Sequence, residues 1–297
     1  MPDSASIPGK IGNYDIKRVL ATGNMGDVYQ ATSMDPRTNT PVYHAVKVLN
    51  PEIAKKLANL QRFRSEIKDD TLLEYKEVGY DPKYQDFFVS DYLEVRPISR
   101  TILRKERSPE IIDLFVRVAT ALDKAHKKNY VHGNIKSSNF LIRRGKDEEG
   151  VESVTPILSD FGLAYIYNED YFSGDRFPGI FPYMAPERME SLLTGEEEEE
   201  EKFSASADVY SLGVVLAETL SGTLPFQEAT TIDSLRTAKQ DTRFVLLHVN
   251  HPVKRVDIRR LNQVIQRCLS PDSGGRYNSA GEFASALAAC RLEAVPV

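Results

Sequence analysis

The stretch His132-Gly133-Asn134-Ile135-Lys136-Ser137-Ser138-Asn139 decides the fold of this chain. It gathers a histidine, a lysine and two asparagines within eight residues, and Asp160-Phe161-Gly162 begins 21 residues after Asn139. An isolated Asp-Phe-Gly carries little information, because tripeptides recur by chance. Here it follows a predicted strand at 156–159 and stands at this separation from the first stretch, so the two motifs together indicate a functional site.

Length and composition indicate a globular protein large enough for two lobes. The chain has 297 residues, of which 41% are hydrophobic and 27% are charged. The net charge of −5 gives no sign of nucleic-acid binding. We therefore expect no nucleic-acid partner. No apolar run approaches the roughly 18 residues that a membrane span needs, so we also expect no membrane span in this chain.

The N-terminus, the cysteines and one charge run complete the composition. Residues 1–10 lack the apolar region of a signal peptide, and we expect 1–13 to form a disordered leader. Cys268 and Cys290 lie in apolar, helical-looking sequence, which predicts buried thiols rather than a disulfide or metal ligands. A cytoplasmic location is the default expectation. Six consecutive glutamates at 196–201 predict a solvated loop, with an acidic docking strip for a basic partner as the alternative.

Hydrophobic periodicity divides the chain near residue 94. The first part shows strand patterns at 14–20, 27–31, 43–49 and 87–93, and one helical pattern at about 51–68. The second part shows helical patterns that start at 108 and cover 206–221, 259–270 and 281–292. A β-rich part followed by an α-rich part predicts two lobes.

The opening stretch resembles the catalytic loop of protein kinases, H-R-D-L-x-x-x-N, with two changes. The family has Asp where this chain has Asn134, and Arg where it has Gly133. The resemblance covers residues from about 14 to 289. Within the family, the sequence is most similar in character to the bacterial serine/threonine protein kinases. It implies one kinase domain at 14–292 with an α+β, bilobal fold: a five-stranded antiparallel N-lobe with helix C at 14–93, and a mainly helical C-lobe at 94–292.

Several residues resemble the family's phosphate-binding groups. Ala21-Thr22-Gly23-Asn24-Met25-Gly26-Asp27-Val28 is similar to the G-x-G-x-x-G-x-V loop, with Ala21 in place of the first glycine. Ala45-Val46-Lys47 is similar to the V-A-I-K strand, whose lysine binds the α- and β-phosphates, and Glu66 to the glutamate that pairs with this lysine. Without the resemblance, these would be a plain hairpin, a surface lysine and a solvated helix charge. The resemblance implies that ATP contacts Ala21, Gly23, Gly26, Val28, Ala45, Lys47 and Glu66.

The resemblance also implies an adenine site and a metal site. Backbone groups of Asp91 and Leu93 would bond adenine, behind a small gatekeeper at Ser90, and Leu141 would form the floor of the adenine site. The metal ligands would be Asn139 and Asp160, which would hold Mg²⁺, and the catalytic-loop lysine Lys136 would neutralise the transferred phosphate.

Three further matches are structural in the family. Ala185-Pro186-Glu187 is similar to the A-P-E motif, and Arg276 stands where its buried ion-pair partner is expected. Asp208 is similar to the aspartate that braces the catalytic loop from the central helix. These residues argue for the fold and not for activity.

The departures from the family pattern fall on one functional subsystem. Asn134 is a neutral amide that cannot accept the proton of a substrate hydroxyl. Gly133 removes the cation that receives a phosphorylated activation segment, and Ser173 is the only aliphatic hydroxyl at 163–183. Ile180 stands where serine/threonine kinases usually have a threonine that bonds the catalytic Asp and Lys. Tolerated drift in one slow enzyme is the alternative explanation.

The sequence therefore predicts a kinase-fold domain whose chemistry is impaired. The leading hypothesis is a serine/threonine pseudokinase that binds ATP and Mg²⁺ and presents a nucleotide-dependent conformation to an unidentified protein partner. The second is a weak serine/threonine protein kinase that transfers the γ-phosphate to protein hydroxyls without a carboxylate base at position 134. The third is a scaffold that binds no nucleotide.

Overall fold

The computed structural model describes residues 8–23, 25–50, 67–98, 108–146, 150, 152–161, 179–194, 204–241 and 256–292. The chain divides into two compact units. The first holds the described residues up to Lys68 together with 73–94, and the second holds 69–72 together with the described residues from Val95 onward. The architecture is α+β, with a curled antiparallel sheet in the first unit and mainly helices in the second, as the sequence predicts.

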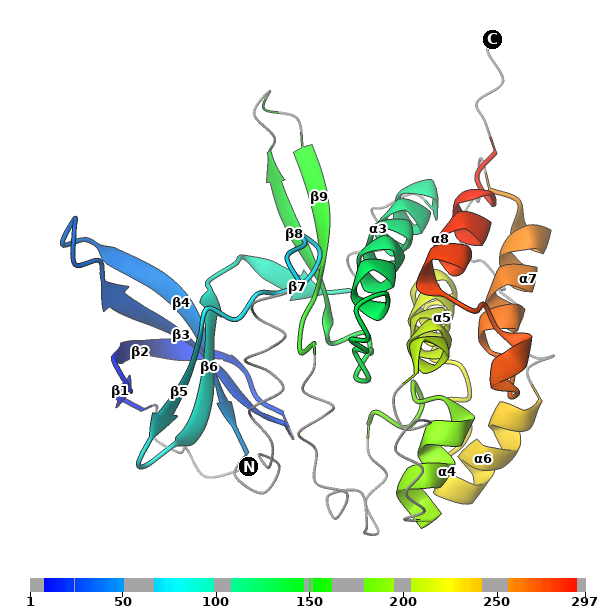
Figure 1. The fold of residues 1–297 in the computed structure, drawn as a ribbon, viewed down its shortest axis with the longest axis horizontal. Helices are drawn as coiled ribbons and strands as arrows, with labels where there is room; N and C mark the ends of the chain where they lie inside the picture. Colours follow the sequence, from blue (N-terminus) through cyan, green and yellow to red (C-terminus); the bar gives the residue numbers. More distant parts are fainter. Residues whose placement is uncertain are drawn as a thin grey trace. The chain divides into compact units, whose positions relative to one another are not determined.

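The first unit is a six-stranded antiparallel sheet in the order β1-β2-β3-β4-β6-β5 (Figure 1). Its strands are β1 (Lys10–Ile11), β2 (Tyr14–Ala21), β3 (Gly26–Met34), β4 (Pro41–Leu49), β5 (Glu77–Asp81) and β6 (Gln85–Asp91). Successive side chains of a strand point to opposite faces of the sheet, so the apolar residues that alternate with polar ones lie on the face toward the core. That core contains Ile11, Tyr14, Ile16, Tyr29, Ala31, Val46, Phe87 and Val89.

The start of the chain differs from the expectation. We predicted a disordered leader at 1–13 and five strands, but Lys10–Ile11 form β1, which adds a sixth strand beside β2. Ile11 is fully buried in the core, and the backbone N–H of Gly12 donates to Asp81 Oδ2 at 2.9 Å. One buried isoleucine and this long-range bond order residues that carry no strand pattern of their own. Residues 1–7 of the predicted leader lie outside the described residues.

The second unit combines a small sheet with helices. Its strands, in the order β7-β8-β9, are β7 (Val95–Pro97), β8 (Phe140–Lys146) and β9 (Glu152–Leu158). Its helices are α3 (Ser108–His126), α4 (Pro186–Thr194), α5 (Ala205–Ser221), α6 (Ile232–Gln240), α7 (Ile258–Cys268) and α8 (Ala280–Ala288), with a 3₁₀ turn at Ser273–Gly275. The predicted helices at 206–221, 259–270 and 281–292 correspond to α5, α7 and α8. The predicted helix at 51–68 lies almost wholly outside the described residues.

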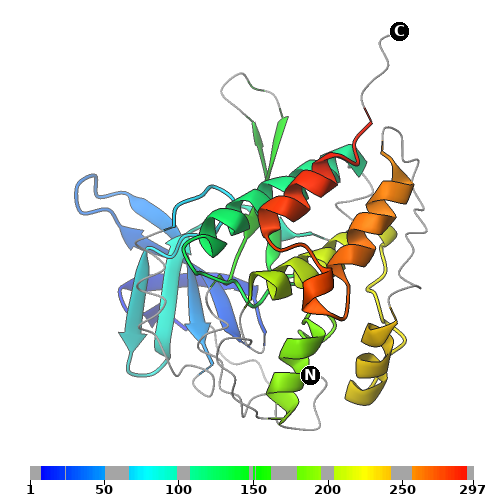
Figure 2. The ribbon, with the colours of Figure 1, turned by 45° about the vertical axis from the view of Figure 1, so that its right-hand side comes forward.

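Helix α5 is the centre of the second unit. Most of its side chains are buried, and it contacts α3, α7 and α8, while α3 packs along α8 (Figures 1 and 2). The Ser204 hydroxyl accepts the N–H of Ala207 and caps the start of α5. Cys268 and Cys290 are both buried free thiols, which confirms the prediction made for them.

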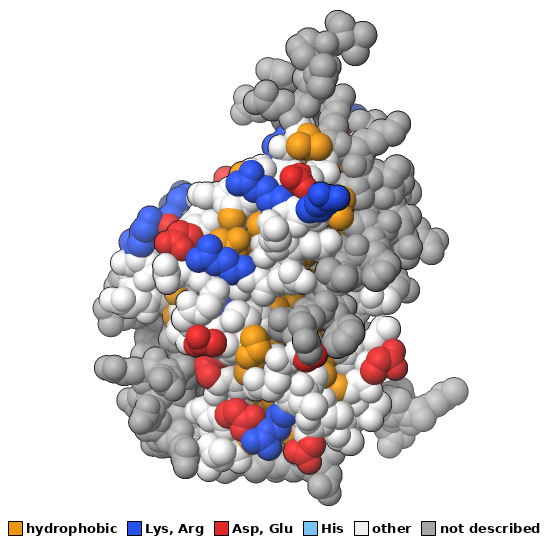
Figure 3. Space-filling model, turned by 90° about the vertical axis from the view of Figure 1, so that its right-hand side faces the viewer, with side chains coloured by type: hydrophobic (Ala, Val, Ile, Leu, Met, Phe, Trp, Pro, Cys, Tyr) orange, Lys and Arg blue, Asp and Glu red, His pale blue; other side chains and the backbone are white. Residues whose placement is uncertain are grey.

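The surface of the described residues is mixed in character. On the face shown in Figure 3, hydrophobic, basic and acidic side chains are interspersed, without a broad field of one charge. None of the helices in the described ranges has the length and apolar character required to cross a bilayer.

Candidate functional site

A buried aspartate on α5 holds the start of the His132–Asn139 loop. Asp208 Oδ2 accepts the backbone N–H of His132 at 2.7 Å, and Oδ1 accepts that of Gly133 at 2.8 Å. His126 Nε2, from the end of α3, lies 2.9 Å from Oδ2. Burial acts to raise the pKa of Asp208, but the bond from His126 and the loop N–H groups hold this pKa below its usual range. Asp208 is therefore a charged brace, as predicted.

His132 is neutral and fixed at both ring nitrogens. It is fully buried, and burial lowers its pKa. Its Nδ1 accepts the backbone N–H of Asn134 at 3.1 Å, so the proton is on Nε2, which donates to the Ser159 carbonyl at 3.0 Å. The ring also packs against Phe161, with centroids 4.9 Å apart. This histidine joins the loop to the start of the Asp160-Phe161-Gly162 motif.

The side chain of Asn134 makes no hydrogen bond within the described part of the chain. The residue is 1% exposed, and among the described residues neither Oδ1 nor Nδ2 is bonded to anything. A buried polar group left without a bond costs about 1–3 kcal/mol. The backbone of Asn134 is well held, through its N–H on His132 and its carbonyl, which accepts Asn139 Nδ2 at 2.9 Å. The loop therefore keeps its shape without any contribution from the Asn134 amide.

Gly133 adopts a backbone conformation that suits glycine. Its φ is +69°, in the left-handed region where a side chain costs about 1–2 kcal/mol. Glycine adopts this backbone conformation without strain, and it stands where the resembled kinases have an arginine.

The predicted metal ligands Asn139 and Asp160 lie on segments that are bonded to each other. Because Asn139 Nδ2 is bonded to the Asn134 carbonyl, its Oδ1 is the atom left for a ligand. The Asn139 carbonyl accepts the backbone N–H of Ser159 at 2.8 Å, which ties it to the residue before Asp160. Asp160 is 8% exposed and has a φ of +64°, an uncommon conformation for a residue with a side chain.

The donor set at these two residues fits Mg²⁺. In the described ranges, no group of three or more His, Cys, Asp or Glu side chains could hold a metal ion. One carboxylate and one amide oxygen, with water and phosphate oxygens as the other ligands, is the kind of site that Mg²⁺ occupies. Lys136 follows Asn134 by two residues in the same loop, and its carbonyl accepts the N–H of Asn139 at 2.9 Å.

In the first unit, four predicted nucleotide residues share one face of the sheet. Val28 on β3 is paired with Ala21 on β2 and with Lys47 on β4. Ala45 lies two residues before Lys47 and therefore on the same face. Lys47 is 7% exposed and is therefore a buried lysine rather than a surface one.

The turn between β2 and β3 requires glycine at one predicted position. Gly26 has a φ of +126°, and a Cβ there would lie 1.9 Å from the Val48 carbonyl oxygen. The N–H of Gly26 donates to the Gly23 carbonyl at 3.0 Å and closes the turn. Gly26 thus lets β3 approach β4 closely.

The predicted adenine residues occupy the end of β6 and the strand β8. Ser90 is 2% exposed, and its hydroxyl donates to the Asp91 carbonyl at 3.3 Å. The Asp91 carboxylate is exposed and paired with Lys76 at 2.6 Å, unlike the buried side chain of Ser90. Leu93 follows β6, and Leu141 is partly buried on β8 opposite Ile157. Glu66, the predicted partner of Lys47, lies outside the described residues.

A chain of two side-chain hydrogen bonds that starts at the loop was not predicted from the sequence. Ser137 Oγ and the Tyr183 hydroxyl lie 2.9 Å apart, and that hydroxyl donates to Glu218 Oε2 on α5 at 2.9 Å. Because the Tyr183 proton goes to Glu218, Ser137 is the donor in the first bond. Burial raises the pKa of Tyr183, so its hydroxyl stays protonated. No local pattern links these residues, which lie 46 and 35 positions apart.

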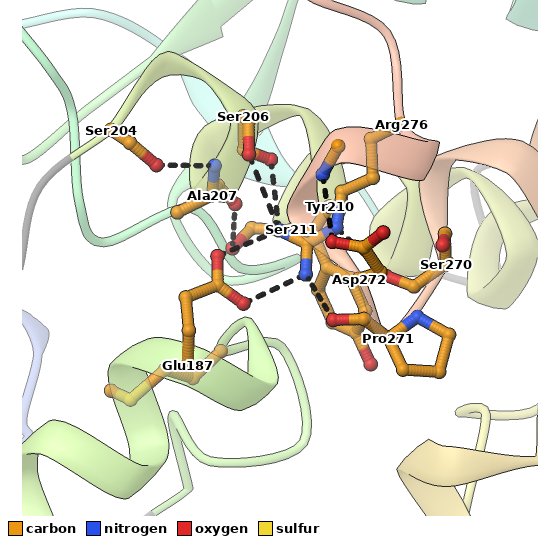
Figure 4. Close-up of polar contacts among 12 residues, drawn as sticks. Glu187, Ser204, Ser206, Ala207, Tyr210, Ser211, Ser270, Pro271, Asp272 and Arg276 are labelled. Atoms are coloured by element: carbon orange, nitrogen blue, oxygen red, sulfur yellow. Dashed lines mark hydrogen bonds and ion pairs between the residues drawn. The ribbon is translucent and has the colours of Figure 1, made fainter. Parts of the chain in front are cut away.

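The predicted pair of Glu187 and Arg276 is present (Figure 4). The guanidinium of Arg276 donates two bonds of 2.7 Å to the Glu187 carboxylate. Its other N–H groups reach the carbonyls of Ser270 at 2.8 Å and Pro271 at 3.0 Å. The Arg276 side chain is 0% exposed, so this is a buried, bidentate ion pair between α4 and the segment before α8.

Comparisons with known proteins agree with these motifs. The family described as "Protein kinase domain" matches residues 14–287. The serine/threonine-protein kinase PknJ of Mycobacterium tuberculosis is 30% identical over 97% of this chain and 47% of its own length. The corresponding values are 27%, 94% and 40% for PknD of M. tuberculosis, and 28%, 94% and 62% for PknA of M. bovis. The chain therefore spans about half the length of the curated relatives it matches.

Proposed function

The chain belongs to the protein kinase family, of the bacterial serine/threonine type, and from this premise we propose that it binds ATP but is impaired in phosphoryl transfer. We infer one kinase domain at 14–292, with lobes at 14–93 and 94–292. Its output would be binding: a nucleotide-dependent conformation recognised by a protein partner. Coupling between two such sites is typically worth about 1–3 kcal/mol.

The observation that carries this proposal is the state of Asn134. It stands at the position of the family's catalytic base, it is neutral, and its buried amide has no partner among the described residues. A positioned base contributes about 10²–10⁴ in rate, or roughly 3–5 kcal/mol of barrier. Asn134 cannot take up a proton near neutral pH, so this contribution is absent.

The groups proposed for the nucleotide are retained. Lys47 would hold the α- and β-phosphates, and Lys136 would neutralise the γ-phosphate. Asn139 Oδ1 and the Asp160 carboxylate would hold Mg²⁺, which when bound neutralises phosphate charge. The left-handed backbone of Asp160 supports this role, because strained residues persist where a site requires them.

A weak protein kinase is the second candidate. Phosphoryl transfer relies mainly on positioning and metal ions, so a chain that retains Lys47, Asn139 and Asp160 could transfer phosphate slowly. The third candidate is a scaffold without nucleotide, in which these residues only maintain the fold.

Thermal shift with ATP and Mg²⁺ tests the proposal. Ligand binding stabilises the folded state by RT ln(1 + [L]/Kd), about 2.7 kcal/mol at a hundredfold excess over Kd. We expect a higher melting temperature for the wild type and a smaller shift for Lys47→Ala. No shift in either protein at millimolar ATP would refute ATP binding. The scaffold without nucleotide would then be the remaining candidate.

Transfer of radiolabelled γ-phosphate tests the impaired chemistry. We expect incorporation at background level in the wild type. Incorporation that Asp160→Asn abolishes would instead establish the weak kinase, because the label would then depend on the proposed metal ligand.

A further inference from the structure

A fully buried lysine reaches the backbone that precedes α4. Lys239 lies in the last turn of α6 and is 0% exposed. Its Nζ donates to the carbonyls of Pro182 at 3.0 Å and Met184 at 2.7 Å, and to the Tyr210 hydroxyl at 3.3 Å. Lysine is almost never fully buried unless it is paired. Here the partners are neutral oxygens, because no carboxylate in the described ranges forms an ion pair with Lys239.

The neighbours of Nζ act in both directions on its charge: the aromatic rings attract an ammonium, while burial and a nearby cation favour the neutral amine. Nζ lies 4.8 Å from the Tyr210 ring centroid and 5.3 Å from that of Phe226. Burial and the charge of Arg276 lower the pKa of Lys239 to about 7, and the Glu187 carboxylate opposes this shift.

Both protonation states satisfy the same three partners. An ammonium donates to the two carbonyls and to the Tyr210 oxygen. A neutral amine donates its two N–H bonds to the carbonyls and accepts the Tyr210 O–H on its lone pair. The bonds to Pro182 and Met184 therefore persist through neutral pH.

The bonds from Lys239 add to a turn that backbone hydrogen bonds within 180–185 already form. In the 180–185 segment, the N–H groups of Tyr183 and Met184 donate to the Ile180 carbonyl at 2.9 and 3.1 Å. The carbonyls of Pro182 and Met184 point the other way, to Lys239. Tyr183 in turn bonds Ser137 of the catalytic loop. Lys239 is thus one end of a bonded path from α6, through the segment, to that loop.

We propose that Lys239 is a positioning residue that holds the 180–185 segment in this turn without phosphorylation of the activation segment. Gly133 removes the cation that would read such a phosphate, whereas α6 supplies N–H donors to the same stretch from within the unit. The inference rests on the proposed binding role, because a partner would then meet the same backbone conformation at 180–185 in every phosphorylation state.

Hydrogen exchange of the segment amides tests this directly. In the full chain, Lys239→Met removes all the N–H donors and keeps most of the unbranched apolar body of the side chain, one atom shorter than lysine. We expect exchange in peptides that cover 180–185 to accelerate at least about tenfold. Phosphatase treatment and Ser173→Ala should both leave the wild-type rates unchanged.

The matched control removes a different cation from the same helix. Arg236 on α6 pairs with Glu190 on α4 and is half-exposed. We expect Arg236→Met to leave exchange at 180–185 at the wild-type rate. Equal acceleration in both variants would overturn the assignment to Lys239, as would wild-type exchange in folded Lys239→Met. Acceleration on phosphatase treatment would overturn the independence from phosphorylation.

A second variant covers the case in which Lys239→Met does not fold. Lys239→Gln keeps an NH₂ donor but is one bond too short to reach both carbonyls. Faster exchange at 183 and 184 in this variant supports the proposal, and wild-type exchange overturns it. The ATP thermal shift of each folded protein separates the two conclusions: without any shift, the proposed nucleotide binding fails while the exchange result stands.

Discussion

Asn134 donates its backbone N–H to Nδ1 of His132 at 3.1 Å, while its own amide side chain bonds to nothing among the described residues. The loop is thus held by its backbone, by the buried histidine and by the charge of Asp208. The identity of the side chain at 134 is separable from the shape of the loop. That separation makes substitutions at 134 informative about chemistry.

We predict that Asn134→Asp does not restore strong kinase activity. No donor in the described ranges bonds the side chain at this buried position, so a carboxylate there would have a raised pKa, which disfavours the charged base. Ile180 also lacks the hydroxyl that would orient it. Radiolabel transfer from γ-ATP should stay within about tenfold of wild type, well below the 10²–10⁴ of a positioned base. The double variant Asn134→Asp/Ile180→Thr should exceed the single variant. A strongly active single variant would show that only the base was missing.

Asn134→Leu should stabilise the fold or leave it unchanged. It replaces a buried amide that has no partner among the residues that the structure describes by an apolar group of similar volume, so the free energy of unfolding should rise by up to about 1–3 kcal/mol. Asn139→Leu is the matched control, because it deletes the bond to the Asn134 carbonyl and should lower that free energy by about 1 kcal/mol. Urea unfolding measures both. A loss of stability in Asn134→Leu would show that the amide has a partner in solution.

The buried ion pair should matter far more than the exposed one. Arg276→Met leaves the Glu187 carboxylate without its partner and should lower the free energy of unfolding by about 3–5 kcal/mol. Arg236→Met breaks a half-exposed pair with Glu190 and should cost about 1 kcal/mol or less. Denaturant unfolding of both variants provides the comparison. Similar losses in the two proteins would contradict the assignment of Arg276 as a buried structural anchor.

Stability should depend on pH through Lys239. Its pKa is about 7 in the folded protein and has the ordinary value of 10.5 when unfolded. Below pH 7 both states hold the proton, and this group adds no pH dependence. Between about pH 7 and 10.5 only the unfolded chain holds it, so the free energy of unfolding rises with pH by up to about 1.4 kcal/mol per unit.

The comparison that isolates this effect is wild type against Lys239→Met. The difference in free energy of unfolding should shift in favour of the wild type between about pH 7 and pH 9. Urea unfolding across this range measures it. Parallel profiles would show that Lys239 keeps its proton in the folded state.

Contacts in which both residues belong to a recognisable family motif could be predicted from the sequence. Glu187 with Arg276, and Asp208 with the loop at His132, lie far apart in sequence, yet each was identifiable because the family pattern names both members. The strands at 14–20 and 43–49 were likewise predictable, because their alternation reflects one buried face.

Contacts without a repeating pattern could not be predicted. Lys239 lies 57 and 55 residues from the carbonyls that it bonds, and any residue type could supply those carbonyls. The strand Lys10–Ile11 is too short to show alternation and depends on its neighbour β2. In both cases the deciding energy comes from tertiary packing, which local propensity does not report.

The left-handed backbone of Gly133 has a consequence for how this protein could change over evolutionary time. A reversion to arginine would incur about 1–2 kcal/mol of conformational strain at once. A benefit from this arginine would also require a phosphorylated activation segment and a carboxylate at 134. On the proposed function, Gly133→Arg alone would therefore cost stability without restoring phosphoryl transfer, so selection would favour it only in combination with changes at 134 and 180.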